Sequence, residues 1–201
     1  MSAHAHPRLT PEQYLEIERS ADFKSEYYDG RMYAMSGGSF RHGLIIGNLT
    51  REVSLALRKK PCSAIPNDLR VAVSPQGLFT YPDVVVVCGE PRFAGDQRDT
   101  LVNPTVVLEV LSPSTEGYDR GFKSEQYRSI ESLQEYGLIS QVKPHIEVFR
   151  RQPHGQWLLS DFGGLEAVCR LESIGCEIAL CDIYEKVDFG GEAPGPPGGN
   201  L

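Results

Sequence analysis

Two acidic residues stand in or beside runs of apolar residues that are typical of buried strands. Glu109 lies within Val106–Leu111, and strand alternation places its carboxylate on the same face as Val107. Asp83 directly precedes four consecutive valines at positions 84–87. Both runs are apolar on the two faces of the strand, which is typical of central strands that are covered on both sides. An ionised carboxylate without a partner in such a strand costs several kcal/mol, so each acid needs a cation, a metal or a proton.

Two kinds of chemistry account for this pair of carboxylates. Acidic residues at the mouths of neighbouring buried strands form a site for a hard divalent cation, which binds carboxylate, carbonyl and water oxygens. Alternatively, each carboxylate pairs with an arginine such as Arg70, or a different strand register exposes it to solvent. The spacing of Asp83 and Glu109 alone favours neither a metal site nor ion pairs.

A segment with helical spacing follows the Glu109 strand and carries a lysine. Lys123 and Tyr127 are four residues apart and share a helix face. Beside two metal-binding carboxylates, the lysine would orient an attacking water or stabilise negative charge that develops on a phosphate. The alternative is an exposed lysine paired with Asp119, and the spacing alone favours this reading. The turn before the helix carries the hydroxyls of Ser112, Ser114 and Thr115. These hydroxyls either hold phosphate or cap the helix.

Local signals predict the elements that must position these residues. Thr10 with Pro11 opens a short helix, Asp29-Gly30 is typical of a hairpin turn, and Ser39 caps a longer helix that ends before Pro61. The pattern then changes to short β-like runs and returns to helical spacing once. We expect strands at 62–65, 69–73, 83–87, 105–111 and 136–140, a helix at 119–132, and a hairpin of 145–151 with 156–159.

Together these elements predict one α/β domain in which helices flank a mixed sheet. The domain spans residues 10–189, between a flexible N-terminus at 1–9 and a Gly/Pro-rich tail at 190–201 that we expect to be disordered. The first twenty residues contain no apolar run, and no stretch of 18 consecutive apolar residues occurs in the sequence. We therefore expect a cytoplasmic protein that does not bind a membrane.

The cysteines of the chain predict neither a disulfide framework nor a zinc site. Their number, five, is odd, and their spacing contains no C-x-x-C pair and no zinc-ribbon pattern. We expect buried thiols in a reducing compartment.

The charge of the chain bears on nucleic acid as a partner. The 201 residues include 40% hydrophobic and 23% charged residues, an ordinary globular composition, and the net charge is −7. Such a chain does not bind nucleic acid through its overall field. Residues 1–60, however, hold nine Lys and Arg against seven Asp and Glu, so the acidic excess lies further along the chain. This distribution predicts at most weak, salt-sensitive binding to DNA.

The order of several short motifs resembles the Uma-two (Uma2) family of restriction-endonuclease-like proteins, within the PD-(D/E)XK nuclease superfamily. The resemblance extends from about residue 10 to about residue 183. Each motif is weak alone, and their order and spacing together are specific. The motifs are YDGRM at 28–32, Ser39 with His42, NDLRV at 67–71, YPDVVV at 81–86 and VLEVLSPST at 107–115, followed by Asp119, Lys123 and Tyr127.

The resemblance implies a restriction-endonuclease-like mixed sheet flanked by helices, preceded by an N-terminal helix and β-hairpin. It also implies a metal-dependent DNA endonuclease that uses Mg²⁺ or Mn²⁺. Asp83 and Glu109 would be the two acidic ligands, with the carbonyl of Val110 and, from the N-terminal segment, Glu26. The superfamily's usual lysine position holds a leucine here, and the resemblance moves that role to Lys123 in the following helix.

The resemblance also implies roles for residues around the metal site. His42 would contact substrate phosphate or add a polar group, although a surface histidine of the helix is an equally good reading. Arg70 would pair with a carboxylate or touch phosphate, and Tyr127 would pack against or orient its neighbours. The candidate substrate-binding residues are therefore His42, Arg70, Ser112, Ser114, Thr115 and Tyr127.

A different class of function uses the same fold. A catalytically silent nuclease-fold protein would bind nucleic acid or act as a protein-interaction homodimer, because a fold does not determine an activity. The two readings differ in geometry: a nuclease requires Asp83, Glu109 and Lys123 to converge on one cleft.

Overall fold

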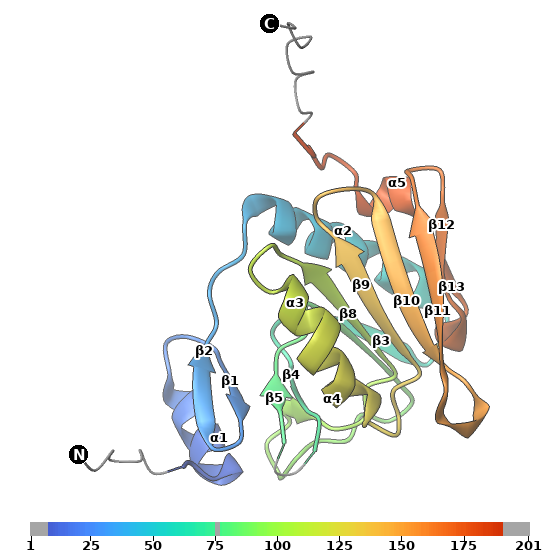
Figure 1. Ribbon diagram of the computed structural model, residues 1–201. Helices are drawn as coiled ribbons and strands as arrows, with labels where there is room; N and C mark the ends of the chain where they lie inside the picture. Colours follow the sequence, from blue (N-terminus) through green and yellow to red (C-terminus); the bar gives the residue numbers. More distant parts are fainter. Residues whose placement is uncertain (1–7, 75–76, 191–201) are drawn as a thin grey trace, which may run out of the picture.

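The chain folds into two main β-sheets and a small C-terminal hairpin, with helices packed against them (Figure 1). The structure is a computed structural model that describes residues 8–74 and 77–190. The helices are α1 (Pro11–Ser20), α2 (Phe40–Leu57), α3 (Glu116–Tyr118), α4 (Ser124–Arg128) and α5 (Leu180–Ile183), with a π-helical segment at Asp119–Lys123 and 3₁₀ turns at Pro153–Gly155 and Glu172–Ile174. The strands are β1 (Ser25–Tyr28), β2 (Arg31–Ala34), β3 (Cys62–Pro66), β4 (Arg70–Ala72), β5 (Phe79–Thr80), β6 (Val84–Cys88), β7 (Thr100–Leu101), β8 (Val106–Leu111), β9 (Glu135–Ser140), β10 (His145–Arg151), β11 (Trp157–Gly163), β12 (Val168–Leu171) and β13 (Cys176–Ala179).

Six strands form the central sheet, in the order β11-β10-β9-β8-β6-β3. β8 pairs in parallel with β9 and antiparallel with β6, so the sheet is mixed. In this register Val84 of β6 lies opposite Leu108 of β8. Asp83 and Glu109, the next residue along each strand, therefore lie beside each other across the two strands.

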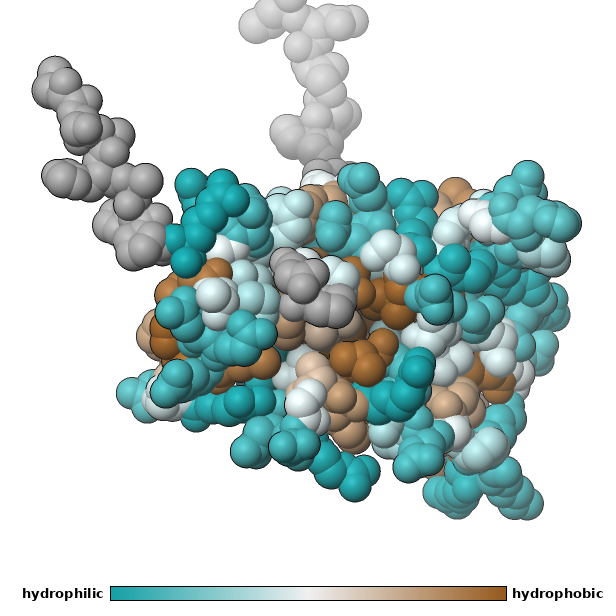
Figure 2. Space-filling view, turned by 90° about the horizontal axis from the view of Figure 1, so that it is seen from below, coloured by the Kyte–Doolittle hydropathy of each residue, from teal (hydrophilic) through white to brown (hydrophobic). Residues whose placement is uncertain are grey.

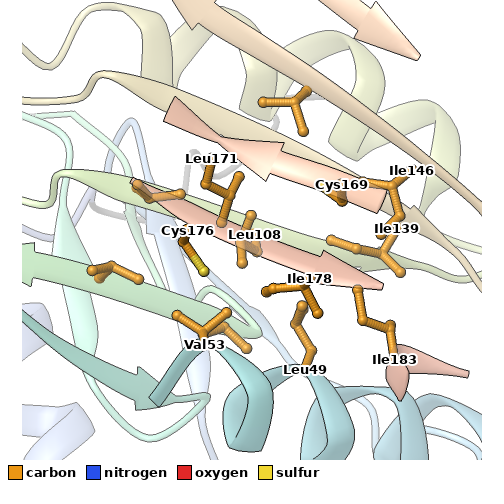
Figure 3. Packing of buried hydrophobic residues seen from close by; sticks show 14 of the residues in the cluster. Leu49, Val53, Leu108, Ile139, Ile146, Cys169, Leu171, Cys176, Ile178 and Ile183 are labelled. Carbon is orange, nitrogen blue, oxygen red and sulfur yellow. The ribbon is translucent and has the colours of Figure 1, made fainter. Parts of the chain in front are cut away.

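One face of the central sheet packs against α2 and the C-terminal hairpin. Leu49 and Val53 of α2 meet Leu108 of β8 and Ile178 of β13 in one apolar cluster, with all four side chains buried (Figure 3). Each buried aliphatic side chain of this kind contributes about 1.5–3 kcal/mol. This layer holds α2, whose first turn carries His42, firmly against the sheet.

The other face is covered by the helical segment after β8 and by part of the second sheet. Tyr127 of α4, Tyr136 of β9 and Leu101 of β7 are fully buried in a second cluster together with Val107. Because both faces are covered, all four valines of β6 are buried, as their run predicts. Glu109 shares the face of Val107 and points into this second layer.

The second sheet has the strand order β2-β1-β5-β4-β7, and α1 packs on it. The rings of Tyr14 in α1 and Tyr27 in β1 stack at 5.0 Å, and Phe79 of β5 meets each of them edge to face. Figure 2 shows this lower side of the molecule, where apolar side chains are surrounded by hydrophilic ones. The packing holds β1, which carries Glu26, against β5.

The predicted fold class is confirmed, and the local signals located most elements. Thr10 and Gln13 form a complete capping box at α1, and Asp29 and Gly30 adopt φ values of 46° and 78° in the hairpin turn. The expected helix at 119–132 is wrong in detail, because helical structure starts at Glu116, passes through a π-helical turn and ends at Arg128. The sequence did not predict five short elements, β5, β7, β12, β13 and α5. Each is two to four residues long, which is too short to show a periodic pattern.

The expected flexible N-terminus and disordered tail lie largely outside the described residues. Of the N-terminus at 1–9, the structure describes only residues 8–9, where Leu9 donates its N–H to the Gly30 carbonyl. Of the tail it describes only Gly190. Within the described ranges, no helix combines the length and the apolar content that crossing a bilayer requires.

The cysteines depart from the expectation of free buried thiols. Cys62 and Cys88 form a disulfide, because the antiparallel pairing of β3 with β6 places them directly opposite each other. Cys169 and Cys176 are free and buried as expected, whereas Cys181 is free and exposed. The pair is 26 residues apart, and its proximity depends on a strand pairing that cysteine spacing does not show.

Candidate functional site

A cavity of about 610 Å³ lies where the adjacent strands β6 and β8 present their acidic residues. Its wall is formed by the linker between β2 and α2, the first turns of α2, the ends of β6 and β8, and the helical segment after β8. The predicted residues in this wall are His42, Asp83, Glu109, Val110, Ser112, Ser114, Thr115 and Lys123, joined by Asp119. The structure thus brings Asp83, Glu109 and Lys123 together on one cavity.

Asp83 and Glu109 are linked to each other through the backbone of the two strands. The Val110 N–H donates to Asp83 Oδ2 at 2.7 Å, and the Asp83 N–H donates to Glu109 Oε2 at 3.2 Å. Burial raises the pKa of Asp83, and the hydrogen bond from Val110 opposes that rise. The strand pairing therefore fixes both carboxylates in a poorly solvated position.

Glu109 is the most deeply enclosed acid of the site, with 3% of its surface exposed. Its Oε1 accepts hydrogen bonds from Tyr127 Oη at 2.9 Å and from Lys123 Nζ at 3.2 Å. Burial raises the pKa of Glu109 to about 8, against the opposing effect of the Lys123 charge. In the absence of a further cation, this carboxyl group therefore holds a proton more tightly than an ordinary glutamic acid.

Lys123 is a buried ammonium surrounded by carboxylates. Its Nζ lies 2.9 Å from Glu26 Oε1, 3.2 Å from Glu109 Oε1 and 3.5 Å from Asp119 Oδ1. Burial lowers the pKa of Lys123, but the three carboxylates raise it further, and the net shift is upward. The reading of Lys123 as an exposed surface lysine is therefore wrong.

The π-helical segment Asp119–Lys123 explains why both of its end residues reach the site. Residues four apart in a helical segment lie nearly on one face, and π turns occur frequently at functional sites. Asp119 is 4% exposed, and burial raises its pKa while Lys123 lowers it. The sequence interpretation placed Asp119 among the motif residues of the resemblance and treated it as a pairing partner of Lys123, but assigned it no role in the site.

Glu26 pairs with Lys123 in this structure. Its Oε1 accepts from the Thr80 hydroxyl as well as lying beside Lys123, and its Oε2 accepts from Tyr118 Oη at 3.1 Å. Glu26 is not among the residues that line the cavity. We use the term acid cluster for the Lys123 ammonium, the three carboxylates of Glu26, Glu109 and Asp119 that contact it, and Asp83, which is linked to Glu109.

His42 lies at the opposite side of the cavity from Lys123's helix, in the first turn of α2. The Ser39 hydroxyl caps this helix by accepting from the His42 N–H at 3.2 Å. The ring Nε2 lies 3.1 Å from the Val110 carbonyl oxygen and 3.3 Å from Asp83 Oδ2. The imidazole is therefore in contact with the acidic residues instead of facing solvent.

Two of the predicted substrate-binding residues do not line the cavity. Arg70 is 3% exposed and donates to Thr100, Tyr81 and Asp99, which matches its pairing with a carboxylate and not a phosphate contact. Tyr127 is fully buried and contacts Glu109.

The hydroxyls of the turn after β8 do line the cavity. Those of Ser114 and Thr115 lie 3.0 and 2.9 Å from that of Ser112. These contacts tie the three side chains together at the edge of the cavity.

The donor chemistry of the cavity fits a hard divalent cation. The acid cluster holds four carboxyl groups, three of which contact its one ammonium, so the buried acids outnumber the cation and an added cation would favour their ionised form. Asp83, Glu109 and the Val110 carbonyl offer oxygen donors, which suit Mg²⁺ or Mn²⁺. In residues 8–74 and 77–190, no group of three or more His, Cys, Asp or Glu side chains is arranged to hold a metal ion by itself. A backbone carbonyl is therefore needed to complete the donor set.

A family model and two sequence relatives match most of this chain. The model of the Uma2 family, described as "Putative restriction endonuclease", matches residues 11–180. The "Uncharacterized protein slr1290" of Synechocystis sp. is 37% identical over 185 residues, which cover 91% of this chain and 95% of that protein. A second Synechocystis protein, "Uncharacterized protein sll1609", is 34% identical over 159 residues, covering 79% of this chain and 90% of its own length.

A solved structure shares the fold. The crystal structure described as that of "a putative nuclease belonging to DUF820" from Anabaena variabilis superposes with a TM-score of 0.71. The match covers 88% of this chain and 97% of that chain, at 17% sequence identity. At this identity the likeness concerns the fold alone.

Proposed function

The chain belongs to the Uma2 family, and from this premise we propose that it is a metal-dependent endonuclease that hydrolyses phosphodiester bonds in DNA. The observation that carries the proposal is the excess of buried carboxylates beside an open cavity. Structural ion pairs balance their charges, because an unpaired buried charge is costly. A cluster with four carboxylates and one ammonium is instead suited to receive a cation.

We assign the metal ligands to the residues with free access to the cavity. Asp83, Glu109 and the carbonyl of Val110 would hold Mg²⁺ or Mn²⁺, and Glu26 would act by holding Lys123 in place. When bound, such an ion polarises the scissile phosphate and lowers the pKa of a water molecule. The β6 and β8 backbones position both carboxylates before substrate arrives, so no reorganisation is needed at that step.

Lys123 would act on the reacting groups directly. Its ammonium stays protonated because three carboxylates surround it, so it serves as a fixed positive charge and hydrogen-bond donor and not as a base. In this role it orients the attacking water or stabilises the charge that develops on phosphate. The hydroxyls of Ser112, Ser114 and Thr115 at the cavity edge are suited to donate to non-bridging phosphate oxygens.

The charges of α2 support weak and salt-sensitive binding of DNA. Arg51 already pairs with Glu52 and Glu185, and Lys60 donates to the carbonyl of Ile174. These cations are partly neutralised within the protein, and the net charge of the chain is −7. We therefore expect affinity to depend on the divalent ion and to fall steeply with added salt.

A plasmid cleavage assay tests the proposal. Supercoiled DNA is incubated with the wild-type protein in Mg²⁺, in Mn²⁺ and in EDTA, and nicked and linear products are quantified. We expect cleavage in the metals only, with a loss of at least about 100-fold for Asp83→Asn and for Glu109→Gln. Glu177→Gln is the matched control, because the Glu177 carboxylate is exposed and pairs with Arg170, far along the chain from Asp83 and Glu109.

The same assay separates the enzyme from a silent nuclease-fold protein. Absence of cleavage in every metal, or equal cleavage by wild type and both variants, would overturn the proposal. The remaining candidate would then be a nucleic-acid-binding or protein-interaction homodimer. Fluorescence anisotropy with labelled DNA and sedimentation at several protein concentrations would distinguish these two roles.

A further inference from the structure

His42 converges with two candidate metal ligands at a single point of the cavity. Its Nε2 is 3.1 Å from the Val110 carbonyl oxygen and 3.3 Å from Asp83 Oδ2. Ligand atoms at right angles around one octahedral ion, each about 2.1 Å from it, are about 3 Å apart. His42 Nε2 therefore lies from each of the two oxygens at the spacing of neighbouring ligands of one ion, which is also a hydrogen-bonding distance.

The position of the imidazole is determined by the backbone around it. Ser39 caps the helix on the His42 N–H, and α2 packs against the central sheet through Leu49 and Val53. A Cβ added at Gly38 would lie 2.8 Å from His42 Nδ1, so the absence of a side chain at that position leaves room for the ring. The side chain of His42 is 16% exposed. The ring is thus held at the cavity and is not a freely rotating surface group.

We propose that His42 Nε2 is a metal ligand, which makes the site a mixed nitrogen and oxygen site that prefers Mn²⁺ and similar transition-metal ions to Mg²⁺. Imidazole suits first-row transition metals, whereas Mg²⁺ favours oxygen ligands. The inference rests on the proposed function, because it uses the same cavity and two of its oxygen donors, Asp83 and the Val110 carbonyl. It changes the role of His42 from a phosphate contact to a residue that determines metal preference.

Coordination through Nε2 requires that this nitrogen carries no proton and that the proton resides on Nδ1. In that tautomer, the contacts of Nε2 with the Asp83 carboxylate and the Val110 carbonyl are not hydrogen bonds, and a shared cation would join the three atoms. The alternative tautomer donates from Nε2 to these oxygens and keeps the donor set purely oxygen. The two tautomers therefore predict different ligands for a bound ion.

Electron spin echo envelope modulation of bound Mn²⁺ tests the proposal directly. This measurement detects a ¹⁴N nucleus bonded to the ion and does not depend on catalysis. We expect nitrogen modulation in the wild-type full-length protein and its loss in His42→Gln. The matched control is His145→Gln, because His145 is similarly buried but pairs with Asp161 and does not line the cavity.

Metal affinities give a second readout. Titration with Mn²⁺ and with Mg²⁺ should show that His42→Gln lowers the Mn²⁺ affinity by about 10- to 100-fold, while the Mg²⁺ affinity changes less than 3-fold. Bound Mn²⁺ without nitrogen modulation, or an unchanged Mn²⁺ to Mg²⁺ affinity ratio in His42→Gln, would overturn the inference and leave the endonuclease proposal intact. Failure of the protein to bind either ion would overturn both. Circular dichroism and thermal unfolding confirm that each variant is folded.

Discussion

Two charged clusters of residues 8–74 and 77–190 differ in their relation to the cavity, because only the acid cluster brings charged side chains to its wall. The acid cluster has four carboxylates and one ammonium. The second cluster, which we call the Arg70 network, joins Arg70 and Arg19 to the carboxylate of Asp99. Arg70 also donates to Tyr81, whose hydroxyl donates to Glu18. The network thus contains two guanidinium groups, both paired with Asp99, and two carboxylates, so its formal charges are equal in number.

The difference between the clusters shows which buried charges point to function. Both clusters contain acids and cations removed from water, so burial alone does not separate them. The Arg70 network pairs both of its guanidinium groups with Asp99 and holds α1 and β4 to the residues before β7, while one buried oxygen of Glu18, Oε2, has no hydrogen-bond partner. The acid cluster leaves negative charge for a partner that enters the cavity. Uncompensated charge beside a cavity is therefore the more informative feature.

Replacing the central cation of the Arg70 network should have the largest effect on stability. Arg70→Met removes a buried charge and its hydrogen bonds to Asp99 and to the Tyr81 hydroxyl, which keep their contacts with Arg19 and Glu18. We expect a loss of about 3–5 kcal/mol in the free energy of unfolding, measured with urea. Cleavage per folded molecule and metal affinity should stay within about 2-fold. Loss of metal binding by the folded variant would show that the two clusters are coupled.

Replacing Lys123, the central cation of the acid cluster, should have its main effect on the rate of DNA cleavage. Lys123→Met is expected to lower the cleavage rate by about 100- to 1,000-fold, because a charge that stabilises the transition state is lost. In EDTA the variant should also lose stability as the pH rises from 5 to 8. Carboxyl groups whose folded pKa exceeds the unfolded value bind protons more tightly in the folded state, so raising the pH favours unfolding. Urea unfolding at the two pH values measures this, and a stability that is independent of pH would contradict it.

The sequence predicted the elements of the fold because their signals are local. The capping box at Thr10, the Asp29-Gly30 turn and the alternating faces of β8 depend only on near neighbours in the chain. The four-valine run likewise indicated a strand buried on both faces. The family resemblance added the order in which these elements occur.

The contacts of the site were less predictable, because they depend on tertiary structure. Whether Arg70 or Lys123 would face the acids was undecided by spacing, and the paired strands and the π turn determine it. The roles of Asp119 and of Glu26 around the ammonium required the same geometry. The disulfide between Cys62 and Cys88 was missed for the same reason, since it depends on which strands are neighbours.

A divalent ion should stabilise the molecule through the acid cluster alone. At an ion concentration of about 100 times Kd, binding to the folded state adds about 2.7 kcal/mol to the free energy of unfolding. Asp83→Asn should abolish this gain, while Asp99→Asn, in the Arg70 network, should lower stability without changing the gain. Thermal unfolding with and without Mn²⁺ makes the comparison. An equal gain in wild type and Asp83→Asn would place the ion elsewhere.

The finest test of the comparison removes one hydroxyl from each cluster. Tyr127 donates to Glu109 at 2.9 Å, and Tyr81 donates to Glu18 at the same distance. Each Tyr→Phe substitution should cost about 1.5 kcal/mol of stability, because each removes a hydrogen bond to a buried carboxyl group. Tyr81→Phe additionally removes the acceptor of an Arg70 N–H, so its total cost in stability should exceed that of Tyr127→Phe.

The clusters should differ in how these two substitutions affect metal binding. Tyr127→Phe removes one of the two hydrogen bonds to Oε1 of Glu109, a candidate ligand, and we expect the Mn²⁺ affinity to fall by about 10-fold, as for other residues that orient a metal ligand. Tyr81→Phe acts on Glu18, which has no such role, and should leave the affinity unchanged. Titration of both variants decides the matter. If both substitutions alter metal affinity equally, the Arg70 network is part of the site, and charge balance does not separate structural from functional clusters in this protein.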